Sequence, residues 1–319
     1  MVIRDTILAV FVAFAVTAVL CPAAIPILHR MKFGQQVRSD GPETHLKKQG
    51  TPTMGGIMIL AGIVVSTLVF SFRYPEALKV LFLTLGFGIV GFLDDFLKIR
   101  KKQSEGLNPK QKLALQFVIT AIFCVWMMMT SDAGTTMLIP FVHIPVTLPA
   151  VLFIPLLFFI VLGTDNGTNF TDGLDGLLAS VTIPVAIFLA AVSVYRSWEI
   201  SPVCGAVLGS LMAFLLFNAY PARVFMGDTG SLAIGGFVAG AACMMQIPLF
   251  IPVFGFIYLI EVVSVIIQVS YFRATHGKRF FRMAPIHHHF EKCGAREPQI
   301  VAAFSVVTAL LCMLSWLLL

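Results

Sequence analysis

Two adjacent carboxylates followed by a lysine, in the pentad Asp94-Asp95-Phe96-Leu97-Lys98, form the first group of residues able to do chemistry. On a helix Asp94 and Lys98 share a face, whereas Asp95 points about 100° away. Neighbouring carboxylates repel each other, so a divalent cation or a proton is expected as a third party. A solvated helix end with a local ion pair is the simpler alternative, and the pentad alone does not exclude it.

A second acidic group follows in residues 165–176, which hold three carboxylates and two amides. After Asp165 the polar residues recur at every third position: Asn166, Asn169, Asp172 and Asp175. If this segment is helical, Asp172 and Asp175 are neighbours, and the interleaved glycines let a backbone or a phosphate approach closely. A loop or a helix cap would explain one such residue but not five, so the segment predicts a functional site.

A third group is the segment Phe225-Met226-Gly227-Asp228-Thr229-Gly230-Ser231. Its glycines predict a turn into a helix N-terminus, where free backbone amides favour phosphate. Asp228 is a candidate metal ligand there, and the rival interpretation is that its carboxylate only caps the helix.

Three consecutive histidines, His287, His288 and His289, lie in the basic loop 272–298. Successive helical positions diverge, so the three cannot easily bind one metal ion, and phosphate binding or proton transfer is the better prediction. An amphipathic surface loop that holds to anionic lipid is the alternative.

The elements that carry these groups must be membrane helices, because the 319 residues are 58% hydrophobic and 12% charged. Mean hydropathy is +0.92. A spanning helix needs about 20 apolar residues. Cutting the sequence at its polar interruptions predicts an all-α polytopic protein with about ten spans: 6–28, 53–71, 78–96, 113–130, 148–163, 174–194, 202–217, 231–246, 249–271 and 299–318.

The lysines and arginines predict the orientation, because basic loops stay cytoplasmic. With the N-terminus outside, 18 of the 22 basic residues fall in inner loops, and only Arg4, Arg73, Lys79 and Arg196 fall outside. Both termini are therefore expected to be external, with the candidate site on the cytoplasmic face. The net charge of +6 then reflects topology and anionic membrane lipids, and no nucleic-acid partner is expected.

A single membrane domain over residues 1–319 is expected, since no repeat, linker or paired cysteine spacing divides the chain. Carboxylates that converge beside lysine, arginine and histidine at a membrane surface suit Mg²⁺ and a diphosphate. Glu261, Ser264 and Gln268 lie on one face of the ninth span. An intramembrane carboxylate is a functional candidate, although a structural hydrogen bond explains Glu261 equally well.

Four of these segments together resemble the phospho-N-acetylmuramoyl-pentapeptide translocase family. They are residues 94–98, the run Asn169-Phe170-Thr171-Asp172-Gly173-Leu174-Asp175-Gly176-Leu177, residues 225–231, and Ala284-Pro285-Ile286-His287-His288-His289-Phe290-Glu291. Residues 51–56 and 108–112 are also similar to the family pattern. The resemblance implies ten transmembrane helices in the bacterial inner membrane and dependence on Mg²⁺. It also implies transfer of phospho-N-acetylmuramoyl-pentapeptide from UDP-N-acetylmuramoyl-pentapeptide to undecaprenyl phosphate, giving lipid I and UMP.

The resemblance also implies roles for individual residues. Asp94, Asp95, Asp228 and His287 are expected to be catalytic, with Asp228 as the metal ligand. The residues expected to bind substrate are Lys47, Lys98, Lys112, Asn166, Asn169, Asp172, Asp175, Phe225, Gln268 and His288. Phe170 stands where the family commonly has leucine, and residues 165–168 are an unusual variant, so contacts there are less well defined by the resemblance.

Two alternatives remain at this point. A related polyprenyl-phosphate N-acetylhexosamine-1-phosphate transferase would share the acidic groups, although the triple-histidine loop favours the muramoyl branch. An ion or proton transporter would place carboxylates near the membrane midplane, where only Glu261 is expected. Whether the protein forms a homodimer, and whether the reaction passes through a covalent phospho-enzyme, the sequence leaves open.

Overall fold

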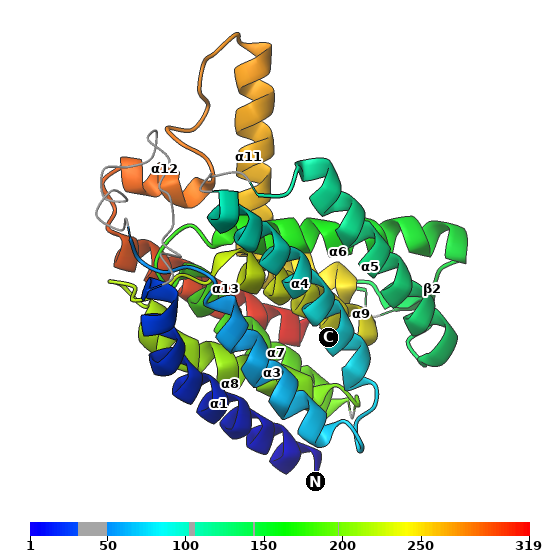
Figure 1. The fold of residues 1–319 in the computed structure, drawn as a ribbon. Helices are drawn as coiled ribbons and strands as arrows, with labels where there is room; N and C mark the ends of the chain where they lie inside the picture. Colours follow the sequence, from blue (N-terminus) through cyan, green and yellow to red (C-terminus); the bar gives the residue numbers. More distant parts are fainter. Residues whose placement is uncertain (31–49, 102–105, 143, 197) are drawn as a thin grey trace.

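The computed structural model describes residues 1–30, 50–101, 106–142, 144–196 and 198–319, which form one bundle of helices (Figure 1). The long helices are α1 Val2–Arg30, α3 Gly56–Phe70, α4 Ala77–Lys101, α5 Pro109–Thr130, α6 Ala150–Thr171, α7 Leu177–Tyr195, α8 Ser201–Asn218, α9 Gly227–Met244, α11 Phe256–Ala274 and α13 Glu297–Leu317. The short ones are η1 Pro248–Phe250, α10 Ile251–Phe254 and α12 Ile286–Lys292.

Each of the ten predicted segments is helical in the structure, and eight helices in the described part of the chain are long and apolar enough to cross a membrane. The shorter α3 has 15 residues, and α9 is the other segment outside the eight. The ninth predicted segment, 249–271, is interrupted at Gly255, where α10 ends before α11 begins. The number of spans and the side of each terminus stay predictions.

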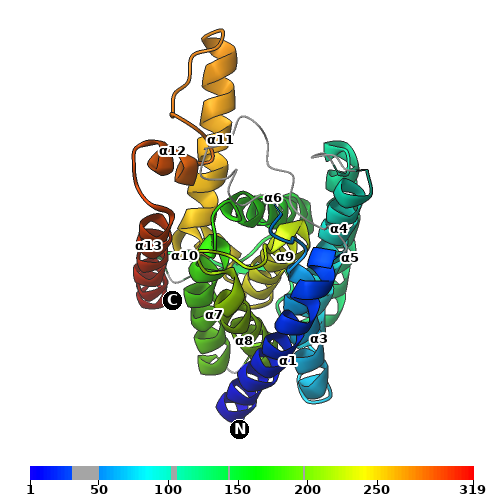
Figure 2. The ribbon, with the colours of Figure 1, turned by 60° about the vertical axis from the view of Figure 1, so that its left-hand side comes forward.

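Helix α9 forms the centre of the bundle, where it packs against α4 and α6 (Figure 2). Every residue from Thr229 to Met244 is buried. Its many glycines and alanines allow this, because small side chains let neighbouring backbones approach closely. At Gly236, for example, an added Cβ would lie 2.7 Å from the carbonyl oxygen of Leu83 in α4.

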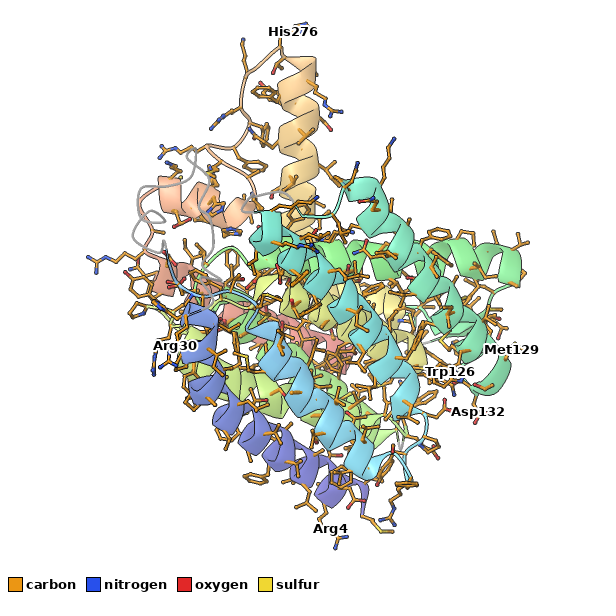
Figure 3. The ribbon with its side chains drawn as sticks, viewed as in Figure 1. Arg4, Arg30, Trp126, Met129, Asp132 and His276 are labelled. Atoms are coloured by element: carbon orange, nitrogen blue, oxygen red, sulfur yellow. The ribbon has the colours of Figure 1, made fainter. Side chains whose placement is uncertain are left out.

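Helix α11 extends beyond the rest of the bundle, and the turn after it projects at His276, at the end of the molecule opposite Arg4 (Figure 3). The chain then returns along α11. The backbone N–H of Phe281 donates to Oε1 of Gln268 at 2.9 Å, and the rings of Tyr271 and Phe280 pack edge to face. This return brings α12, with its histidines, back to the bundle.

A small β-hairpin was not expected from the sequence. Strands β1 (Thr136–Leu138) and β2 (Pro145–Thr147) pair antiparallel, with Thr136 opposite Thr147 and their hydroxyls 2.9 Å apart. Both strands fall between the fourth and fifth predicted spans. The prediction of an all-α chain is therefore correct for the bundle but missed this connection.

Candidate functional site

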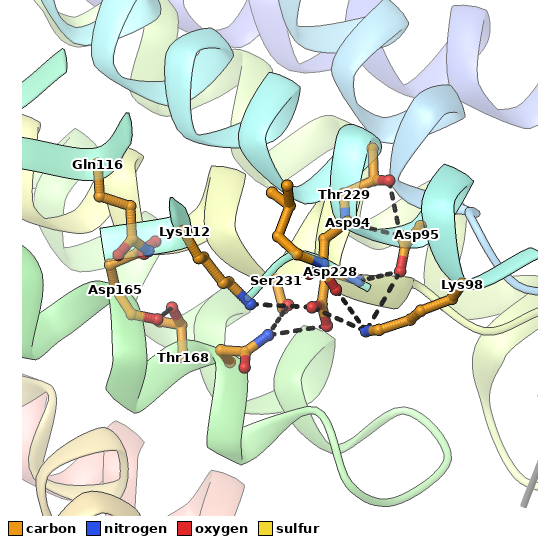
Figure 4. Close-up of polar contacts among 12 residues, drawn as sticks. Asp94, Asp95, Lys98, Lys112, Gln116, Asp165, Thr168, Asp228, Thr229 and Ser231 are labelled. Atoms are coloured by element: carbon orange, nitrogen blue, oxygen red, sulfur yellow. Dashed lines mark hydrogen bonds and ion pairs between the residues drawn. The ribbon is translucent and has the colours of Figure 1, made fainter. Parts of the chain in front are cut away.

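The candidate site is centred on Asp228, in the first turn of α9 (Figure 4). Three other helices supply its hydrogen-bond donors. Lys98 from α4 and Lys112 from α5 place their Nζ atoms 3.0 Å and 2.9 Å from Oδ2, and Asn169 from α6 donates to Oδ1 at 3.0 Å. Residues from four separate sequence segments thus meet at one carboxylate, and all four were named as site residues in the sequence analysis.

Asp94 and Asp95 lie beside Asp228, and one carboxylate oxygen from each of the three is within 4.8 Å of the other two. Asp94 accepts hydrogen bonds from Lys98 at 2.6 Å and from the backbone N–H of Leu107 at 2.8 Å. The first of these contacts confirms that Asp94 and Lys98 share a helix face. The hydrogen bond from Leu107 connects the residues just before α5 to α4.

Asp95 caps the N-terminus of α9 from the neighbouring helix. Its carboxylate accepts hydrogen bonds from the backbone N–H groups of Asp228 and Thr229, at 3.2 Å and 2.9 Å, and from the Thr229 hydroxyl at 2.7 Å. The first N–H groups of a helix have no partner within it, and here they are buried. The residue preceding α9 makes no side-chain cap, and the Asp228 carboxylate bonds to Lys98, Lys112 and Asn169 instead. The alternative that Asp228 merely caps its own helix is therefore wrong.

Two glycines allow this close approach of α4 and α9. Gly227 has φ +73°, and a Cβ there would lie 2.6 Å from Oδ2 of Asp95. A side chain at Gly91 would overlap the carbonyl group of Asp228. Larger residues at these positions would push the Asp95 carboxylate away from the end of α9.

The two lysines dominate the electrostatics of Asp228, which lies ahead of the predicted eighth span. Burial opposes ionisation, but the ammonium groups of Lys112 and Lys98 hold the pKa of Asp228 well below its usual range. Asp172, just beyond the end of α6, behaves in the opposite way. Burial, followed by the negative charges of Asp228 and Asp95, raises the pKa of Asp172 well above its usual range.

The donor set fits Mg²⁺. Carboxylate oxygens are the ligands this hard cation prefers, and it commonly takes one or two of them together with substrate phosphate oxygens. Asp94, Asp95 and Asp228 can each offer one such oxygen, and all three also have hydrogen-bond or ion-pair partners within the protein. Lys98 and Lys112 sit where they balance the charge of the carboxylates.

Sequence analysis missed a second polar layer, one helical turn deeper. Gln116 of α5 donates to Oδ2 of the wholly buried Asp165 in α6, while Oδ1 of Asp165 has no hydrogen-bond partner among the described residues. Because Gln116 follows Lys112 by four residues, and Asp165 precedes Asn169 by four, helical spacing in these spans was a usable signal. Asp165 lies inside α6, because this helix continues to Thr171, beyond the predicted span 148–163.

The hydroxyls of Thr229 and Ser231 were also not singled out. The Thr229 hydroxyl donates to Asp95, and Nδ2 of Asn169 donates to Oγ of Ser231 at 2.9 Å as well as to Asp228. Both hydroxyls follow Asp228 within one helical turn, so they stabilise the carboxylate network from the same helix.

The sequence analysis made Asp172 and Asp175 neighbours on the condition that their segment is helical, and the structure does not meet that condition. The helix ends at Thr171, and Asp172 and Asp175 lie in a turn before α7, so they are not neighbours on a helix face. Oδ2 of Asp175 accepts a hydrogen bond from the backbone N–H of Ala222 at 2.9 Å. This contact holds the 172–176 turn against the segment that leads into α9.

The histidines lie on α12 and point to different partners, as successive helical positions must. Nδ1 of His287 is 3.0 Å from Oε1 of Glu261 in α11, and Nδ1 of His288 is 2.6 Å from Oε2 of Glu291. His289 accepts a hydrogen bond from the backbone N–H of Arg282. Of the three only His287 is fully buried, and it gives the intramembrane Glu261 its partner.

Other residues expected to bind substrate have local partners. The Asn166 side chain donates to the carbonyl oxygen of Leu162 in its own helix, and Gln268 accepts from Phe281 as described above. Phe225 is half-buried and pairs through its backbone with Pro52 and Gly55. Lys47 lies outside the described residues.

Comparison with known proteins gives concordant matches. The model of glycosyl transferase family 4 matches residues 77–246, and signature 1 of phospho-N-acetylmuramoyl-pentapeptide-transferase matches residues 48–60. A curated phospho-N-acetylmuramoyl-pentapeptide-transferase from Clostridium perfringens (strain SM101) is 47% identical, over 97% of this chain and 95% of the relative. Those from Clostridium novyi and Acetivibrio thermocellus are each 45% identical, over 98% and 95% of this chain and 96% and 92% of theirs. These names favour the muramoyl enzyme over the related transferase and the transporter.

Proposed function

Because the chain belongs to the phospho-N-acetylmuramoyl-pentapeptide-transferase family, we propose that its acidic centre transfers phospho-N-acetylmuramoyl-pentapeptide from a UDP carrier to undecaprenyl phosphate. The products are lipid I and UMP. The observation that carries the proposal is the meeting of Asp94, Asp95 and Asp228 with two lysines at one end of the central helix. Such a centre suits phosphoryl transfer, where charge on phosphate oxygens must be neutralised.

Asp228 would hold Mg²⁺, which when bound supplies positive charge to the diphosphate of the UDP-sugar. In the structure its carboxylate already has two ammonium groups as counter-charges. When substrate binds, Lys98 and Lys112 would be available to phosphate oxygens, and Lys47 is proposed to act in the same way.

In the reaction an oxygen of the lipid phosphate attacks the β-phosphorus of the UDP-sugar. The bond from that phosphorus to the oxygen bridging it to the α-phosphate breaks, and UMP leaves with the bridging oxygen. Asp94 is proposed to accept the proton of the lipid phosphate or to favour its dianion, since general-base catalysis needs a carboxylate within hydrogen-bond reach. Asp94 suits this better than Asp95 because α9 does not occupy its carboxylate.

Asp95 would contribute to the reaction by fixing the end of α9. Three donors from Asp228 and Thr229 converge on its carboxylate, so any movement of Asp95 would move the Asp228 backbone. Metal ligands are commonly oriented by such outer contacts.

The remaining substrate contacts are proposed around this centre. Asn169 donates a hydrogen bond to Asp228, and the negative charge of Asp228 helps to raise the pKa of Asp172. These interactions support a place for Asn169 and Asp172 near the diphosphate. The residues proposed to line the sugar and nucleotide regions are Asn166, Asp175, Phe225, Gln268, His287 and His288, with the Phe225 ring stacked on uracil.

The site is proposed to face the cytoplasm, and a native cysteine makes this testable. Cys293, just after α12, is exposed, whereas the other five cysteines are buried. A membrane-impermeant maleimide should label Cys293 in inside-out vesicles and not in intact spheroplasts, with Cys293→Ser as the control for specificity. Labelling in spheroplasts would place the histidine helix outside and defeat the site assignment.

The activity itself is tested with purified protein and radiolabelled UMP. Exchange of the label into UDP-N-acetylmuramoyl-pentapeptide should require Mg²⁺ and undecaprenyl phosphate, because reversal of a direct transfer needs lipid I. Exchange without the lipid would indicate a covalent phospho-enzyme instead. No lipid I formation from the two substrates would refute the proposed function.

A further inference from the structure

Glu261 is a buried carboxylate in the middle of α11 for which the reaction outlined above has no use. It is 0% exposed, and so is His287 on α12, whose Nδ1 lies 3.0 Å from its Oε1. The second oxygen of Glu261 and Nε2 of His287 have no hydrogen-bond partner among the described residues. The pair therefore joins the two helices through a single contact.

The burial of this pair restricts where its protons lie. A carboxylate removed from water costs several kcal/mol unless a donor or a counter-charge compensates it, about 2–7 kcal/mol even for a neutral polar group. Among the described residues, the group within hydrogen-bond reach of the Glu261 carboxylate is Nδ1 of His287, which donates when it carries the proton. A carboxylate bound to one ring nitrogen fixes the orientation of an imidazole and leaves the other nitrogen for different work.

The other nitrogen, Nε2, faces the turn that borders the acidic centre. An added Cβ on Gly173 would overlap the imidazole at Nε2, so the glycine backbone lies directly against it. Gly173 follows Asp172, whose carboxylate feels the charges of Asp228 and Asp95. His287 thus reaches the edge of the centre across the 172–176 turn, and Glu261 lies behind it.

We propose that Glu261 is a positioning residue for the reaction, which holds His287 with Nδ1 protonated and Nε2 directed through the Gly173 side toward the substrate phosphates. The inference rests on the proposed function and deepens it, because it assigns a role to the intramembrane carboxylate. Gly173 covers Nε2 in this structure, so the proposal requires the 172–176 turn to shift before substrate can reach this nitrogen. Glu261 itself touches no reacting atom.

Substitution tests whether Glu261 acts through His287. Glu261→Gln keeps the size of the side chain but permits either imidazole tautomer. It should lower kcat about ten- to a hundredfold, the usual cost of losing such an orienting partner, with KM for the UDP-sugar changed less than about threefold. In a His287→Ala background, Glu261→Gln should cause no further loss. The matched control is Tyr258→Phe. Tyr258 lies in α11, as Glu261 does, and the substitution removes its buried hydrogen bond to Thr182 of α7 but should leave kcat near normal.

A purely structural role would give a different pattern. If Glu261 only fastened α12 to α11, Glu261→Gln would lower the melting temperature, but kcat measured well below that temperature would stay near normal. A stable kcat of this kind, or a further loss of kcat when Glu261→Gln is added to His287→Ala, would overturn the proposal.

A second measurement needs no activity, so it separates this inference from the proposed function. In protein labelled with ¹⁵N-histidine, with the His287 signals identified by their loss in His287→Ala, Nδ1 should carry the proton and Nε2 should not. Glu261→Gln should shift the population toward the other tautomer. A native His287 with Nε2–H as the main form would contradict the proposal, whatever the transfer assay shows.

Discussion

The acidic centre and the histidine helix hold their functional side chains in opposite ways. Asp228 has donors from α4, α5 and α6, and its charge is balanced by two lysines. His287 has one ring nitrogen paired with Glu261 and a second ring nitrogen with no hydrogen-bond partner among the described residues. The acidic centre concentrates charge, whereas the contact with Glu261 orients a single imidazole ring.

The difference indicates two kinds of contribution to catalysis. A carboxylate held by two ammonium groups can exchange those contacts for a metal ion without being left buried and uncompensated. An imidazole whose Nδ1 is held by a carboxylate contributes a correctly oriented Nε2 rather than a charge. We therefore expect substitutions that change charge to be severe in the acidic centre, and substitutions that change shape to be milder near α12.

The largest effect is expected for Asp228→Asn. The variant keeps its size and can still accept from Asn169, but it loses the charge that holds the metal, so turnover should fall at least about a thousandfold. Asp132→Asn, in an exposed loop, is the matched control and should be near normal. Measured turnover and melting temperature decide the point, since an active and stable Asp228→Asn would move the metal to the group Asp94, Asp95 and Asp172.

Asp94→Asn should be the next most severe change. Loss of a general base typically costs about a hundredfold or more, with little change in substrate affinity. Steady-state kinetics with separate kcat and KM values would show this. A variant that retained near-normal kcat with substrate binding intact would remove Asp94 from the proposed role and blur the contrast between the two regions.

Asp95→Asn should lower stability as well as activity. An amide cannot accept on both of its terminal atoms, so part of the cap on α9 is lost, at a cost of about 1–3 kcal/mol for unsatisfied buried donors. Thermal unfolding should show a lower melting temperature for Asp95→Asn than for Asp94→Asn. Equal melting temperatures would mean that the cap contributes little to the structure.

Near the histidine helix, Gly173→Ala tests the effect of shape alone. The new methyl group would displace His287, so kcat should fall about tenfold, in the range of outer-contact losses. The control is Gly163→Ala. An added methyl group there would meet no neighbouring atom, so this variant should have no effect on kcat. If both alanine variants behaved alike, the contact between Gly173 and His287 would have no functional meaning.

The smallest effect is expected for Asp175→Asn. An asparagine can still accept the hydrogen bond from Ala222, so the turn should be preserved, and KM for the UDP-sugar should rise less than about threefold. A rise above tenfold would show instead that the Asp175 charge meets the nucleotide directly.

The sequence predicted the helical segments of this chain better than it predicted the connections between them. Apolar length located all ten helical segments, because lipid demands a continuous run of hydrophobic residues and satisfied backbone groups. Helical spacing brought Asp94 and Lys98 together correctly. The β-hairpin and the break at Gly255 were missed, since neither short strands nor one glycine interrupts an apolar pattern clearly.

Tertiary contacts explain the other differences. Asp95 appeared equivalent to Asp94 in sequence, but the buried end of α9 requires an acceptor, and α4 places Asp95 there. Similarly, nothing in the ninth span alone showed that Glu261 would meet His287, which is 26 residues later in the chain. Both pairings depend on helices whose contacts the sequence pattern does not specify.

Direct metal binding tests the central claim, that Asp228 holds the divalent ion of the acidic centre. Mn²⁺ can replace Mg²⁺ as a probe, and the free ion can be measured by electron paramagnetic resonance in titrations of full-length protein in detergent. The native protein and Asp132→Asn should bind Mn²⁺ at one site, and Asp228→Asn should bind it at least about tenfold more weakly, as loss of a charged ligand requires. Unchanged Mn²⁺ affinity in a folded Asp228→Asn protein would contradict the account.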